Sequence, residues 1–190
     1  PTIIGAAAVL AGVGLTHYLG ERRQRRQAKE RRRLAKEHQC REVLARLRGQ
    51  REILFTSCVA LASAKVSLRT MPPSLNGNLE LERELTSQGR ESQAKINEAI
   101  PRAIEAMWTL HYLFPGDADL LKCVEAAEAG ITAWQDHPPP EALFNALENS
   151  QTPKAVSNAE TALYDYNRRK VREIIGKPID ALIAYAAKHT

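Results

Sequence analysis

The residues best suited to chemistry in this 190-residue chain are eight basic side chains that fall within 12 consecutive positions. They are Arg22, Arg23, Arg25, Arg26, Lys29, Arg31, Arg32 and Arg33. Guanidinium and ammonium groups bind phosphates, so this basic segment (residues 22–33) predicts contact with anionic lipid or with nucleic acid phosphates. Residues 22–33 contain no aromatic residue, so the pattern does not suggest a surface that stacks unpaired bases.

The charge of the chain is divided unevenly around this segment. Residues 21–51 hold 13 Lys and Arg against 4 Asp and Glu, whereas the remaining residues hold 14 against 18. The chain therefore combines a strongly basic stretch with a mildly acidic remainder. Such asymmetry indicates a local electrostatic partner for the basic stretch and says little about the partner of the rest.

Motifs that carry catalysis or bind cofactors are missing from the sequence. The five histidines are widely separated and form no HxxxH, HExxH or Cys/His cluster. The sequence contains no phosphate-binding glycine loop, dinucleotide fingerprint or nucleophile elbow. Cys40, Cys58 and Cys123 form no CxxC pair and are expected to be free, mostly buried thiols. We therefore predict no cofactor, no local metal site and no enzyme activity, and only a site assembled from distant residues stays open.

An uncharged run of 18 residues, 2–19, precedes the basic segment. As a helix it would measure about 27 Å, close to the thickness of a bilayer core. The positive charge follows the run, so the pattern favours a retained single-pass anchor over a cleaved signal peptide. The same charge predicts an N-terminus outside and a cytoplasmic C-terminal part. The alternative is an apolar helix that packs inside a protein assembly.

Small side chains recur every four residues along this apolar run. Ala8, Gly12, Thr16 and Gly20 fall on one face of a helix, where small residues let two helix backbones approach closely. This spacing predicts helix self-association. The simpler interpretation is that glycine and alanine are common in membrane helices.

The rest of the pattern predicts an all-α fold, because no run of residues alternates as a strand would. Apolar residues follow a heptad from residue 40 to 68, typical of a coiled coil or a bundle helix, and Arg51 and Lys65 interrupt it. Pro72 and Pro73 end this helix. Gly176 and Pro178 predict a break before a last short helix. The further helices are expected at residues 79–113, 117–134, 141–149, 153–175 and 179–188.

Together these patterns predict an N-terminal transmembrane helix (1–20), a basic juxtamembrane helix (21–40) and a cytoplasmic antiparallel bundle of about four helices (41–190). The expected function is non-enzymatic: a binding, adaptor or assembly subunit near the cytoplasmic membrane face. Its expected partners are a membrane with anionic lipid and a protein, and it could form a homo-oligomer; nucleic acid is the less favoured partner. The alternative is a structural subunit of a large viral or tail-like assembly, in which the basic stretch contacts nucleic acid.

Overall fold

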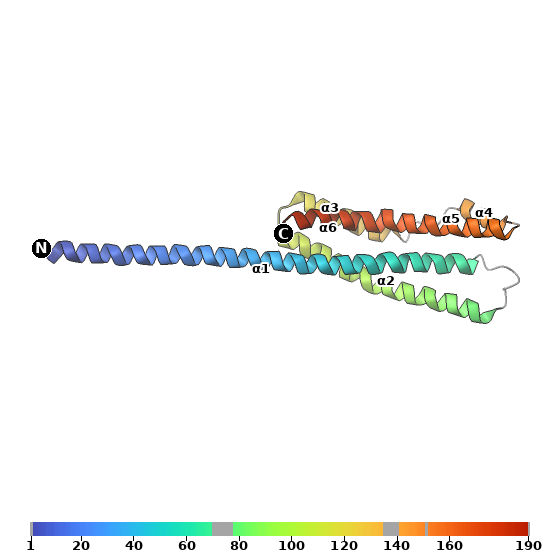
Figure 1. Cartoon of the computed structure of the whole chain (residues 1–190), viewed down its shortest axis with the longest axis horizontal. Helices are drawn as coiled ribbons and strands as arrows, with labels where there is room; N and C mark the ends of the chain where they lie inside the picture. Colours follow the sequence, from blue (N-terminus) through green and yellow to red (C-terminus); the bar gives the residue numbers. More distant parts are fainter. Residues whose placement is uncertain (1, 70–77, 135–140, 151, 190) are drawn as a thin grey trace. The chain divides into compact units, whose positions relative to one another are not determined.

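A computed structural model describes residues 2–69, 78–134, 141–150 and 152–189, with side chains from Gly20 onward except at positions 141, 153 and 189 (Figure 1). The chain divides into two compact units, Pro1–Cys40 and Arg41–Thr190. Helix α1 (Thr2–Arg69) contributes its first part to one unit and its remainder to the other.

The described residues form helices and no strand, which confirms the all-α prediction. After α1 come α2 (Leu79–Leu113), α3 (Ala118–Ala133), α4 (Glu141–Glu148), α5 (Pro153–Val171), a π-helical turn (Arg172–Gly176), α6 (Lys177–Ala186) and a 3-10 turn (Ala187–His189). The predicted proline turn at residues 72–73 lies outside the described residues.

Side-chain caps explain where three of these helices begin. The backbone N–H of Leu120 donates to Asp117 Oδ1 at 3.0 Å at the start of α3, as the sequence predicts. Asn78 and Thr152 cap α2 and α5 in the same way. Each cap satisfies a backbone donor that the first helical turn leaves without a partner.

The prediction of a membrane-spanning N-terminal helix, and with it of a single-pass membrane localisation, is wrong. Within the described part of the chain, no helix is both long enough and apolar enough to cross a bilayer. The run at residues 2–19 is short, and seven of its 18 residues are glycine or alanine, which bury little apolar surface. It also contains the polar residues Thr16 and His17.

In the second unit, residues 41–69 of α1 pack antiparallel to α2. Residues 43–50 of α1 and residues 102–109 of α2 line one groove, and farther along α1 the side chain of Ala64 lies beside Gly89, earlier in α2. The order along one helix is therefore reversed along the other. Helix α3 packs against α2 and against α6. Figure 1 shows α5 and α6 running back toward the end of the unit where α3 begins, so the unit is an antiparallel helical bundle.

The heptad of α1 supplies much of the core of this bundle. Leu47, Leu54 and Cys58 are fully buried, and Leu44 and Leu61 are nearly so. Burial of each leucine contributes about 1.5–3 kcal/mol relative to exposure. The two predicted interruptions differ, because Lys65 is exposed whereas Arg51 is partly buried and paired.

A smaller core joins α1 to α4 and α5. Its buried members are Val66, Phe144, Leu147 and Leu163. The guanidinium of Arg69 lies 4.0 Å from the centroid of the Phe144 ring, so a cation–π contact covers this cluster at the end of α1. The cluster fixes the short helix α4 against the rest of the bundle.

The chain does not break between α5 and α6, contrary to the prediction at Gly176 and Pro178. It passes through the π-helical turn, in which the backbone N–H of Lys177 donates to the carbonyl of Arg172. Pro178 has no N–H, so the carbonyl of Ile174, four residues earlier, has no α-helical donor. That carbonyl lies against Gly130 of α3, where a Cβ atom would overlap it. Glycine at this position therefore makes room for the turn.

Two polar contacts fasten α6 to the bundle. Arg51 of α1 donates from Nε and Nη2 to both carboxylate oxygens of Asp180, at 3.1 and 2.8 Å. Tyr185 donates from its hydroxyl to Asp117 Oδ1 at 2.9 Å, and this hydrogen bond raises the pKa of Tyr185. The last helix is thus tied both to the first helix and to the start of α3.

Candidate polyanion-binding segment

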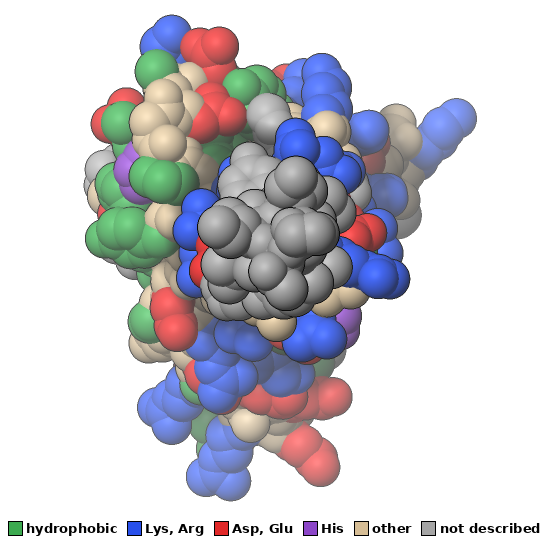
Figure 2. Space-filling view, turned by 90° about the vertical axis from the view of Figure 1, so that its left-hand side faces the viewer, with side chains coloured by type: hydrophobic (Ala, Val, Ile, Leu, Met, Phe, Trp, Pro, Cys, Tyr) green, Lys and Arg blue, Asp and Glu red, His purple; other side chains and the backbone are tan. Residues whose placement is uncertain are grey.

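The basic segment lies in the first unit, on a part of α1 that is exposed throughout. Every residue from Gly20 to Lys36 is exposed. This exposure follows from composition, because the stretch has only one large apolar side chain, Leu34, and that side chain is itself 57% exposed. Figure 2 shows Lys and Arg side chains standing out from the visible surface, with carboxylates between them.

Two of the eight basic residues form ion pairs with glutamates that flank the segment. Arg25 lies 3.8 Å from Glu21, and Arg33 donates to Glu37 at 2.8 Å, each pair one helical turn apart. The hydrogen bond and the charge of Glu37 raise the pKa of Arg33. Both arginine side chains are more than 80% exposed, so salt screens these pairs and a polyanion can compete with them.

The other six basic residues form no ion pair with any residue that the structure describes. They are Arg22, Arg23, Arg26, Lys29, Arg31 and Arg32. All six are exposed to solvent. An arrangement of this kind can bind a polyanion by releasing the counterions that surround it.

Of the four residues predicted to form a self-association face, the structure describes the surroundings of Gly20 alone. Ala8, Gly12 and Thr16 belong to the stretch whose side chains are not described. Gly20 is exposed, and no described atom lies within 4 Å of the position that a Cβ would occupy. The self-association of this face stays a prediction.

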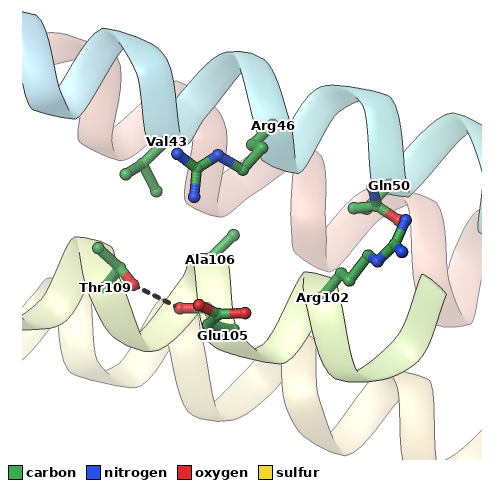
Figure 3. A pocket seen from close by; sticks show the side chains of 7 residues that line it. All are labelled: Val43, Arg46, Gln50, Arg102, Glu105, Ala106 and Thr109. Carbon is green, nitrogen blue, oxygen red and sulfur yellow. Dashed lines mark hydrogen bonds between the residues drawn. The ribbon is translucent and has the colours of Figure 1, made fainter. Parts of the chain in front are cut away.

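A groove between α1 and α2 in the second unit is a further concave feature, with a volume of about 210 Å³ (Figure 3). Arg46 and Gln50 line it from α1, and Arg102, Glu105 and Thr109 line it from α2. The Oε1 atom of Gln50 is buried and finds no hydrogen-bond partner among the described residues. The guanidinium groups favour an anion, whereas Glu105 places a carboxylate in the same groove. The groove therefore does not define the charge of a ligand.

The three cysteines are free thiols, as the sequence predicts. Burial raises the pKa of the Cys58 thiol to about 12, so this thiol stays protonated and unreactive at neutral pH. In the part of the chain that the structure describes, no three His, Cys, Asp or Glu side chains come together where they could hold a metal ion.

Sequence reasoning missed residues of two kinds. Lys36 is an exposed basic residue three positions after Arg33, and a search by helical spacing would have added it to the segment. Arg46, Gln50 and Arg102 meet only through the register of α1 against α2, which no local pattern encodes.

The chain matches no protein-family model, no curated protein and no solved structure.

Proposed function

We propose that this chain is a non-enzymatic binding and assembly protein whose basic segment contacts the phosphate groups of a nucleic acid. The observation that carries the proposal is the presence of eight exposed basic residues within 12 positions of one helix. A protein that neutralises several phosphates releases condensed counterions, and this release supplies most of the affinity in binding that does not depend on sequence.

The second unit supports the assembly part of the proposal. Its bundle is packed around buried leucines, so it is a firm body on which a partner or a second copy of the chain can dock. Tyr112 is 75% exposed at the end of α2 and lies beside His111, with 5.9 Å between the ring centroids. Tyrosine is enriched in protein interfaces, because its large ring and its hydroxyl can both make contacts there.

Salt-dependent binding of the full chain to a fluorescent mixed-sequence DNA duplex tests the nucleic acid part. We expect log K to fall linearly with log salt between about 50 and 200 mM. Phosphatidylcholine vesicles with and without phosphatidylserine provide the comparison. Binding only to the phosphatidylserine vesicles would contradict the proposal and identify anionic lipid as the partner.

Sedimentation equilibrium of the full chain tests the assembly part. A concentration-dependent increase in mass, weakened by Tyr112→Ser, would support docking through the end of α2. A chain that stays monomeric at all concentrations, alone and with the duplex, would contradict self-assembly.

A further inference from the structure

The basic residues of the first unit are arranged by helical spacing into one continuous stripe. Successive residues of an α-helix are turned by about 100°, so positions three, four and seven apart lie on one face. Seven basic residues obey this spacing and cover about a third of the helix circumference. We call them the basic stripe: Arg22, Arg25, Arg26, Lys29, Arg32, Arg33 and Lys36.

The residues outside the stripe include two basic residues and all the acidic residues of this stretch. Arg23 and Arg31 are the two basic residues of the segment that point away from the stripe. The acidic residues Glu21, Glu30 and Glu37 fall at its two edges, where Glu21 and Glu37 pair with Arg25 and Arg33. The stripe itself contains no carboxylate. One face of the helix is therefore uniformly positive.

We infer that the basic stripe binds along the phosphate backbone of a nucleic acid duplex. The inference rests on the proposed function and adds to it the face of the helix and the form of the partner. From Arg22 to Lys36 the stripe extends about 21 Å along the helix axis, with one positive charge per roughly 3.5 Å. One strand of a DNA duplex carries one phosphate per roughly 3.4 Å of axis. Per unit length of axis, the stripe and one strand of the duplex therefore carry similar densities of opposite charge.

Two other polyanions fit the same residues less well. A helix that lies in a membrane interface needs a broad apolar face opposite its charges, and Leu34 is the only large apolar residue between positions 20 and 37. A single strand is held by aromatic side chains that stack on its bases, and this stretch contains none. A duplex presents an ordered row of phosphates and requires neither feature.

Two double variants of the full chain separate the stripe from total charge. Arg22→Gln/Lys29→Gln removes two charges from the stripe, and Arg23→Gln/Arg31→Gln removes two charges outside it. All four residues are exposed and form no ion pair with a described residue, and glutamine is a good helix former. Circular dichroism should therefore show the same helix content in both variants.

The measurement is the slope of log K against log salt for a DNA duplex of about two turns, roughly 21 base pairs. Each lost phosphate contact lowers the slope by about 0.9, so the stripe variant should lose about 1.8 and the off-stripe variant much less. The single strand of the same sequence should bind more weakly than the duplex.

Three other results would contradict the inference in part or in full. Equal loss of slope in both variants would leave the proposed function intact and refute the stripe. Binding to the single strand as tight as to the duplex would refute the duplex as partner. Binding of the unchanged chain to neither nucleic acid would refute the proposed function and this inference together.

Discussion

Two stretches of helix α1 are both α-helical but differ in burial and in what stabilises them. Residues 20–36 are exposed at every position, and even Leu34 is 57% exposed. Residues 43–66 carry a buried heptad in which Leu47 and Leu54 have no exposed surface. The second stretch is held by tertiary burial, whereas the first depends on helix propensity and local ion pairs. A continuous helix therefore need not have one cause or one role along its length.

The largest expected difference between the two stretches is in the effect of removing a leucine. Leu54→Ala should lower the free energy of unfolding by about 2–5 kcal/mol, because it leaves a cavity in the bundle. Leu34→Ala should change it by less than about 0.5 kcal/mol. Urea denaturation of both variants measures the difference. Equal effects would mean that Leu34 is buried by a contact in the folded protein.

A second pair of variants compares a glycine of the bundle with a glycine on the surface of α1. Gly130→Ala should destabilise the chain by about 1–3 kcal/mol, because its methyl group would overlap the carbonyl of Ile174. Gly49→Ala has open space around it and should stabilise the chain by about 0.4–1 kcal/mol. Thermal unfolding measures both. A neutral Gly130→Ala would mean that α3 and the π-helical turn lie farther apart.

The buried thiol of Cys58 should make the bundle sensitive to alkaline pH. Burial raises its pKa from the ordinary 9.0 to about 12. The unfolded chain therefore loses this proton first, and stability present below about pH 9 falls as the pH rises toward 12, by at most about 1.4 kcal/mol per pH unit. Urea denaturation at several pH values should give a steeper decline for the unchanged chain than for Cys58→Ala. If the free energy of unfolding fell equally with pH in both proteins, the raised pKa of Cys58 would be contradicted.

The ion pair between Arg51 and Asp180 should have a smaller effect. Only 23% of the Arg51 side chain is exposed, and the contact is bidentate, so a double-mutant cycle with Arg51→Gln and Asp180→Asn should give a coupling of about 0.5–1 kcal/mol. The same cycle at the exposed pair Glu98 and Arg102, one turn apart on α2, should give no more than about 0.3–0.5 kcal/mol. A coupling between Arg51 and Asp180 that is no larger than that between Glu98 and Arg102 would show that the pair contributes no more than an exposed ion pair.

The sequence was sufficient to predict elements whose signals are local. The heptad of α1, the cap at Asp117 and the start of α2 near Leu79 depend on side chains within a few residues of one another. The polar residue Arg51 inside the heptad could not be interpreted, because its partner Asp180 is 129 residues away. The basic segment could be named from composition, but its division into a stripe and two outlying arginines required helix geometry.

Two predictions were wrong, the membrane span at residues 2–19 and the helix break at Gly176 and Pro178. Both relied on a local feature of the sequence alone. Absence of charge at residues 2–19 indicated a membrane span, although glycine and alanine supply little apolar surface. Gly176 and Pro178 indicated a break, although a helix can absorb a missing donor by widening one turn where its neighbour has room. At this turn the room comes from Gly130, which is distant in sequence.

The tie between Arg51 and Asp180 has a consequence for how the chain is made. A ribosome adds about 5–20 residues per second, so on the order of 10 s pass between the synthesis of these two residues. During this interval the part of α1 around Arg51 lacks its contact with α6. The bundle therefore cannot close before α6 has been made, and a nascent chain that ends before α6 should be a substrate for chaperones.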